Sequence, residues 1–214
     1  MRHDRATTLA AAALLALAAF ARPAGAGEIA VEGQGGYRSL AFKDTAQALF
    51  DTTGGGTFGG ALRFTFWRGA FVSAGFRTFS VDGERGFLAS STAPIQKLGF
   101  PLSLKIDSFP LMAGYRFHAG HLIVPYVAAG ASVTKYEETS EVAGESFDKS
   151  VSKTGFTGVG GVEVGRGIFR FGAEVGYTTV SGAIGNDGVS RVYGEDDIGG
   201  FHVVGKIVVA FGGR

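Results

Sequence analysis

The stretch Asp107–Lys135 reads DSFPLMAGYRFHAGHLIVPYVAAGASVTK and contains two apolar runs joined by the short segment HAGH. Similar pairs of runs recur along most of the chain. Several of them place apolar residues at every second position, and none after residue 26 shows a convincing helical spacing. Alternation with a period of two is typical of half-buried strands, so the sequence predicts an all-β fold.

Each predicted strand has one oily face and one face that carries isolated charges. In TFGGALRFTFWR (57–68), Phe58, Phe64 and Phe66 lie opposite Arg63. In GIFRFGAEVGYTT (167–179), apolar residues alternate with Arg170 and Glu174. A large apolar face on strand after strand indicates that these faces meet something other than water.

The strands and their connections together predict an eight-stranded antiparallel up-and-down transmembrane β-barrel. The predicted strands are 28–41, 57–67, 70–81, 102–117, 122–136, 153–165, 167–179 and 198–211. Long polar segments alternate strictly with short turns, of which HAGH is one. Because every second connection of an antiparallel barrel returns to the same side, all long loops would lie at one end, as in outer-membrane barrels. Closure would also satisfy every backbone hydrogen bond without water.

Residues 1–26 are predicted to be a cleavable signal peptide, which leaves residues 27–214 as the barrel domain. Arg2 and Arg5 precede the apolar run 9–21, which is too short to span a bilayer as a helix, and Ala24-Gly25-Ala26 fits a cleavage site. Without the leader, 17 basic and 18 acidic residues remain of 20 and 19. This balance argues against a nucleic-acid partner. The chain has no cysteine, so disulfides cannot stabilise it.

The segments SFPLMAGYRF (108–117), VPYVAAGASV (124–133) and RFGAEVGYT (170–178) resemble the small outer-membrane β-barrel proteins of Gram-negative bacteria, the OmpA/OmpX/OmpW-like group. The resemblance implies an outer-membrane location with both termini in the periplasm. It also implies outer-membrane lipids and lipopolysaccharide as neighbours, and the barrel assembly machinery and periplasmic chaperones as partners during biogenesis. A monomer is expected, without cofactor.

The last strand would be the one that the assembly machinery recognises. Its outward residues are predicted to be Phe201, Val203, Ile207, Val209 and Phe211. Members of the group commonly finish on an aromatic residue, whereas this sequence finishes AFGGR. Phe211 is expected to take that role from slightly inside the end.

Charged residues on the inner faces are predicted to form a network in the lumen. They are Glu32, Arg38, Arg63, Arg77, Lys105, Asp107, Glu163, Arg170, Glu174, His202 and Lys206. Isolated charges there would be costly, so they should pair across strands and plug the barrel. The alternative is a narrow conduit or a gate that opens when pairs exchange, with Glu174 and either Arg170 or Arg63 at its centre.

Catalytic and metal sites are not predicted. His118 and His121 lie three residues apart in the HAGH turn and could bind a metal as a pair, but a metal site needs further ligands. His202 has only scattered serines near it in the sequence, so a lipid-modifying enzyme is a minor alternative.

Two further groups of residues are expected at the membrane boundary and beyond it. Acidic residues of the long loops should keep them solvated or hold divalent cations; they are Glu137, Glu138, Glu141, Glu145, Asp148, Glu195, Asp196 and Asp197. Aromatic residues near strand ends should form interfacial girdles; they are Phe58, Phe66, Trp67, Phe71, Phe117, Phe169, Tyr177, Phe201 and Phe211.

Three functional hypotheses follow. The first is an outer-membrane barrel with a structural, adhesive or surface-interaction role carried by its long loops. The second is a narrow pore or transporter for ions or small, possibly hydrophobic, molecules. The third is a soluble ligand-binding barrel of lipocalin type, which the outward apolar faces and the alternating loop lengths disfavour.

Overall fold

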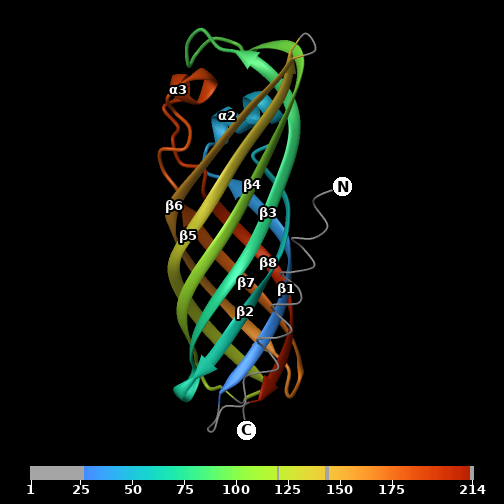
Figure 1. The fold of residues 1–214 in the computed structure, drawn as a ribbon, viewed down its shortest axis with the longest axis vertical. Coiled ribbons are helices and arrows are strands. Elements are labelled where there is room, and N and C mark those ends of the chain that lie inside the picture. Colours follow the sequence, from blue (N-terminus) through green and yellow to red (C-terminus); the bar gives the residue numbers. More distant parts are fainter. Residues whose placement is uncertain (1–26, 120, 143–144, 213–214) are drawn as a thin grey trace.

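The computed structural model describes residues 27–119, 121–142 and 145–212. The predicted signal peptide lies outside the described residues. Within them, eight strands follow one another around a single closed barrel, and each pairs antiparallel with its neighbours (Figure 1). The strands are β1 (Glu28–Leu40), β2 (Gly54–Phe66), β3 (Ala70–Phe87), β4 (Gln96–Arg116), β5 (Ile123–Val142), β6 (Glu145–Val164), β7 (Phe169–Thr179) and β8 (Gly200–Gly212). The predicted fold is therefore confirmed.

The barrel closes between its first and last strands. β1 pairs with β8 from Glu28 opposite Gly212 to Leu40 opposite Gly200, without a break in register. A closed sheet leaves no strand edge at the level where all eight strands are paired, so the backbone there is satisfied without water. The three helical segments of the described residues are short: α2 (Lys43–Phe50), α3 (Gly188–Tyr193) and the 3₁₀ turn η1 (Trp67–Gly69). None of these helices is long and apolar enough to cross a membrane.

The strands differ greatly in length, and the difference lies at one end of the barrel. β3, β4, β5 and β6 have 18 to 21 residues, whereas the other four have 11 to 13. We call the end with the short connections the turn end and the opposite end the loop end. Figure 1 shows the four long strands continuing past the others at the loop end, beside α2 and α3.

This extension corrects the predicted loops. The polar segments around 82–100 and 137–150 were predicted to be loops, yet much of each belongs to the β3–β4 and β5–β6 hairpins. The other two long loops contain α2 and α3. A strand that has left the membrane needs no oily outer face, so the alternation that identified the other strands is absent here.

An outward apolar belt surrounds the part of the barrel where all strands are paired. Its most exposed side chains include Phe58, Leu111, Phe169, Phe171 and Ile207, each at least 58% exposed. A band of exposed apolar residues of this kind matches the hydrocarbon layer of a membrane.

The predicted girdle residues mostly lie on this outer face, with one error. Phe58, Phe66, Phe117, Phe169, Tyr177, Phe201 and Phe211 are exposed. Phe71 is only 3% exposed and lies inside the barrel, because its side chain packs on Tyr126 across the lumen. The side chain of Trp67 lies outside the described part of the chain.

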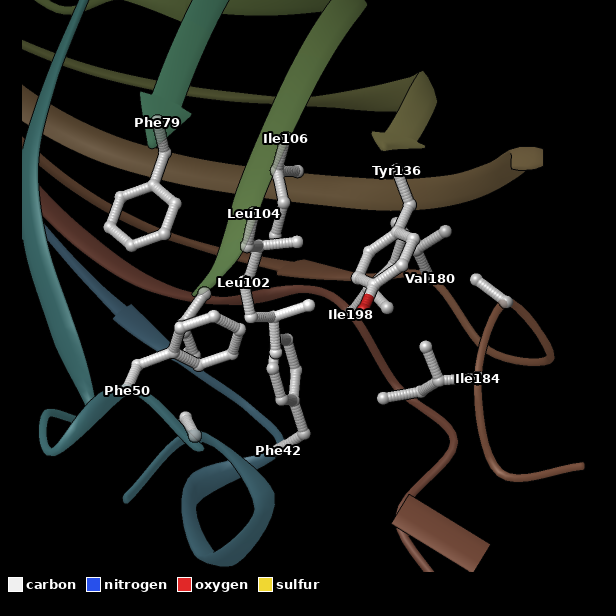
Figure 2. Close-up of a cluster of buried hydrophobic side chains, with 13 residues drawn as sticks. Phe42, Phe50, Phe79, Leu102, Leu104, Ile106, Tyr136, Val180, Ile184 and Ile198 are labelled. Carbon is white, nitrogen blue, oxygen red and sulfur yellow. The ribbon is translucent and has the colours of Figure 1, made fainter. Parts of the chain in front are cut away.

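A hydrophobic cluster, here called the apolar cap, fills the barrel at the loop end (Figure 2). It consists of Leu40, Phe42, Ala46, Phe50, Phe79, Leu102, Leu104, Ile106, Tyr136, Val180, Ala183, Ile184 and Ile198. α2 contributes Ala46 and Phe50 from one face, and β4 contributes three residues at alternate positions. An eight-residue helix is not stable alone, so α2 depends on this packing.

The charged lumen as candidate functional site

Below the apolar cap, the interior is filled by charged side chains that alternate with outward apolar residues on the same strands. The ion pairs form two groups. The group nearer the turn end centres on Glu163, which is fully buried and contacts both Arg63 and Arg116. Arg116 also lies 2.8 Å from Glu28, and Arg170 lies 2.5 Å from the other oxygen of Glu28. Three arginines therefore share two carboxylates at the turn end.

The second group centres on Glu174 of β7. Its Oε1 accepts a hydrogen bond from Arg77 at 3.2 Å, and its Oε2 accepts bonds from Lys206 at 3.1 Å and from the Tyr126 hydroxyl at 2.8 Å. Glu32 joins the two groups, because it lies 2.5 Å from Lys206 and 2.8 Å from Arg63. The lumen thus holds one continuous network.

An aromatic pair narrows the space between the two groups. Tyr126 and Phe71 meet edge to face with ring centroids 6.3 Å apart, and the Arg63 guanidinium lies 5.6 Å from the Phe71 ring. Glycines make room for both rings: a Cβ at Gly161 would lie 2.5 Å from the Tyr126 ring, and one at Gly114 would lie 2.5 Å from Phe71. The two rings therefore fit inside the barrel because the glycines opposite them have no side chain.

Very little space remains in the lumen. Two cavities in the described structure each have a volume of about 10 Å³, enough for about one water molecule. Arg63, Glu163 and Glu174 are each at most 2% exposed. Burying such charges costs several kcal/mol per ion unless each is paired, and removal of one partner typically costs about 3–5 kcal/mol. The described lumen is therefore filled by a buried charged network whose members are expected to depend on one another.

Nine of the predicted lumen residues lie inside the barrel, and two do not. The nine are Glu32, Arg38, Arg63, Arg77, Glu163, Arg170, Glu174, His202 and Lys206. Lys105 and Asp107 lie on the outer wall, where they form an ion pair of 2.8 Å and Thr78 donates to Asp107. The prediction was wrong because even-numbered residues of β4, such as Leu104 and Ile106, face inward.

The predicted centre was also only half correct. Glu174 contacts Arg77 and Lys206, whereas Arg63 and Arg170 belong to the group at the turn end. Sequence reasoning missed Glu28, Arg116 and Tyr126 as network members. Arg116 and the buried Leu104 both occupy even-numbered positions of β4. If the even-numbered face of β4 had been assigned to the interior, Arg116 would have been predicted to lie in the lumen.

Other predicted positions have simple structural surroundings. The rings of His118 and His121 lie 5.6 Å apart in the turn, and the described residues contain no group of three or more metal-ligating side chains. On β8, Phe201, Val203, Ile207 and Phe211 are exposed on the outer wall, and Val209 is half-buried there.

Two of the acidic loop residues stabilise the segments above the lumen. Both carboxylate oxygens of Glu195 accept hydrogen bonds from the first turn of α2, from Asp44 N at 3.0 Å and Thr45 N at 2.9 Å. Asp197 accepts bonds from the backbone of Val180 and Gly199, both at 2.7 Å. These hydrogen bonds hold α2 and the segment between β7 and β8 against the apolar cap.

The Tyr136 hydroxyl is a polar atom at the edge of the apolar cap. It donates a hydrogen bond of 2.7 Å to Glu138. Burial, and then the nearby Glu138 carboxylate, raises the pKa of Tyr136, so the hydroxyl keeps its proton. Tyr136 therefore acts as a neutral hydrogen-bond donor there.

A closed barrel with an outward apolar belt and a filled charged lumen defines a small integral membrane barrel. The family model described as outer membrane protein beta-barrel domain matches residues 7–203. The chain belongs to this family, and its place is the bacterial outer membrane. No curated protein sequence matches the chain.

Solved structures show the same fold at low sequence identity. OprG from Pseudomonas aeruginosa is 14% identical with a TM-score of 0.59, over 87% of this chain and 97% of that one. A major outer membrane protein from Thermus thermophilus is 9% identical with a TM-score of 0.55, over 87% of this chain and 100% of that one. Neisserial surface protein A is 12% identical with a TM-score of 0.52, over 86% and 97%. These likenesses concern the fold alone.

Proposed function

We propose that the protein is a monomeric, non-enzymatic outer-membrane barrel that acts through its loop end while its lumen stays closed. The observation that carries the proposal is the double filling of the interior. A buried ion-pair network and an apolar cap follow one another along the barrel axis. Such a barrel conducts poorly, so its contact with the surroundings passes through the exposed end.

The proposed orientation places the loop end outside the cell and both termini in the periplasm, after removal of residues 1–26. Small outer-membrane barrels have short periplasmic turns and longer outer loops, and the chain has this asymmetry. Lipopolysaccharide would then surround the upper barrel wall. The assembly machinery and periplasmic chaperones would meet β8 and its outward aromatic residues, Phe201 and Phe211, during insertion.

The surface-interaction role is supported by apolar side chains exposed beyond the membrane belt. Phe87 is 58% exposed and Leu98 is 49% exposed, near the tip of the β3–β4 hairpin. Phe147 of β6 is 47% exposed and carries the Arg85 guanidinium over its ring. Exposed apolar residues gathered at one end favour contact with another surface.

The test of this role compares cells that display the wild type with cells that display Phe87→Ser and Leu98→Ser together. The wild type should increase retention of cells on a hydrophobic surface, and the double variant should lose most of that increase. Phe58→Ser, a change on the membrane belt, serves as the matched control once surface display is equalised. Equal retention by cells with and without the protein would contradict the proposed role.

A second candidate is a gated pore, and it is favoured by one observation. Glu174 has four polar neighbours within 3.7 Å, Arg77, Lys206, Tyr126 and His202, so it could exchange partners without losing them all. Such an exchange would have to move the apolar cap as well. A lipid-modifying enzyme is disfavoured, because Ser108 and Ser132 share a cavity with His202 that is far too small for an acyl chain.

A further inference from the structure

The charges buried in the lumen do not balance. Within the described residues, six cationic side chains line the interior and four carboxylates face them. The cations are Arg38, Arg63, Arg77, Arg116, Arg170 and Lys206, and the carboxylates are Glu28, Glu32, Glu163 and Glu174. An uncompensated charge in a low-dielectric interior is costly, so an excess of positive charge calls for negative charge from outside this set of residues.

The excess is located at the side of the network nearest the apolar cap. Arg38 is 5% exposed, and its Nη2 donates to two carbonyl oxygens, Ile198 O at 2.9 Å and Gly199 O at 3.4 Å. Among the described residues it forms no ion pair, unlike the other five cations. The nearby Asp197 carboxylate attracts Arg38 without contacting it, because it accepts its hydrogen bonds from Thr179, Val180 and Gly199.

A small cavity lies beside Arg38, and its lining is rich in hydrogen-bond donors. Arg38, Arg77, Ser132 and His202 line it, and it is closed by neighbours such as Met112. Three buried polar atoms of this lining have no hydrogen-bond partner: Arg77 Nε, Ser132 Oγ and His202 Nε2. His202 Nε2 lies 3.7 Å from Glu174, too far for a hydrogen bond.

The second cavity of the lumen provides an internal comparison. It has a similar volume, but Glu32 and Glu174 line it together with Arg63 and Lys206, so both signs of charge are present. The cavity beside Arg38 has no carboxylate in its lining. Two cavities of equal size in one lumen therefore differ in the charge that they would accept.

We propose that the cavity beside Arg38 is a binding site for a small monatomic anion, chloride in most surroundings. The two guanidinium groups supply the attraction, and Arg77 Nε and the Ser132 hydroxyl supply hydrogen bonds. His202 adds a third donor in the tautomer that carries its proton on Nε2. A volume of about 10 Å³ admits one ion of about the size of water and excludes phosphate, sulfate and carboxylic acids. Together with the Asp197 carboxylate near Arg38, one such anion would offset the two excess positive charges.

The first test is a crystal structure of the wild type grown in bromide, read by anomalous scattering. The proposal expects a bromide peak in the cavity between Arg38 and Arg77 and no peak in the cavity beside Glu174. A well-ordered lumen without a peak in the first cavity, or with uncharged water there, would overturn it.

The second test measures thermal unfolding in detergent at matched ionic strength, in bromide or chloride and in gluconate, which is too large to enter. Ligands that bind only the folded state raise its unfolding midpoint. The wild-type midpoint should be higher in the halides; equal midpoints in the three salts would overturn the proposal. Arg38→Met should lose the halide dependence, while Arg116→Met, the same change at the turn end, should keep it.

If Arg38→Met does not fold, Ser132→Ala replaces it, with a reduced halide dependence expected. Persistence of the full dependence in whichever of these variants folds would place the ion elsewhere and contradict the proposed site. None of these outcomes bears on whether the barrel conducts, so the anion site and the closed lumen can fail separately.

Discussion

The two halves of the barrel interior are sealed by opposite chemistries. Towards the turn end, where all eight strands are paired, the lumen holds charged side chains such as Arg63, Glu163 and Glu174. Towards the loop end, where only β3–β6 continue, the interior holds apolar side chains such as Phe42 and Leu104. The same chain thus uses ion pairs inside the membrane and a hydrophobic core above it.

The difference follows from which face meets lipid. Inside the membrane the outer wall must be apolar, so the polar residues of each strand lie on the inner wall. Above the membrane the outer wall meets water, and the inner wall can form an ordinary hydrophobic core with α2 and the β7–β8 segment. The extension has the pattern of a soluble protein built onto a membrane barrel.

The largest expected effect concerns the charged half. Glu163→Gln leaves Arg63 and Arg116 without their shared carboxylate, so we expect a loss of about 3–5 kcal/mol of unfolding free energy. Equilibrium unfolding in guanidinium, in detergent micelles, measures it. Glu141→Gln on an exposed site of β5 is the control, with a change within about 0.5 kcal/mol. Equal effects of the two changes would show that the network does not stabilise the barrel.

The apolar half should respond to lost volume. Leu104 is fully buried in the apolar cap and Leu98, on the same strand, is 49% exposed. Leu104→Ala should cost about 2–5 kcal/mol, because it leaves a cavity in a packed core. Leu98→Ala should change the same unfolding free energy by less than about 0.5 kcal/mol. A small effect of Leu104→Ala would mean that the cap is loosely packed.

A smaller effect is expected where the cap is fastened by hydrogen bonds. Glu195→Gln removes the carboxylate charge that both first-turn amides of α2 contact, which should cost about 1 kcal/mol. Hydrogen exchange of the α2 amides should accelerate while that of β1 stays unchanged. Asp196→Asn, at the exposed neighbouring residue, should leave both unchanged. Unaltered exchange in Glu195→Gln would show that packing alone holds α2.

The smallest effect tests the corrected facing of β4. Lys105 pairs with Asp107 on the outer wall, with 51% of its side chain exposed, so Lys105→Gln should cost less than about 1 kcal/mol. Lys206→Gln, inside the lumen beside Glu32 and Glu174, should cost far more. Comparable losses of unfolding free energy in the two variants would indicate that Lys105 faces the lumen and would contradict its place on the outer wall.

The sequence predicts the membrane half well, because lipid imposes a strict pattern there. β7 and β8 alternate cleanly, so Glu174 and Lys206 could be placed inside from their neighbours alone. The loop end imposes no such pattern, which is why the extension of the β5–β6 hairpin over residues 137–150 and α2 were predicted to be loops. Lys105 was misplaced for the same reason, since β4 has passed the belt at that residue.

The partners within the lumen could not be read from the strands singly. Glu174 of β7 contacts Arg77 of β3, which lies on the opposite side of the barrel. The stagger of all eight strands determines which residues lie at the same height along the barrel axis and can therefore meet across the lumen. Long-range register, rather than local pattern, determines these contacts. Phe71 is a different case, because it shares its parity on β3 with Arg77, which was correctly placed inside, so alternation within the strand already predicts its inward orientation.

The most direct test of the two seals is the single-channel conductance of the mature protein, refolded in detergent and inserted into a planar bilayer. A folded barrel with both seals in place should show no discrete conductance steps, whereas Glu163→Gln and Leu104→Ala together should show them. Reproducible steps in the wild type would contradict the closed lumen and move the function to transport.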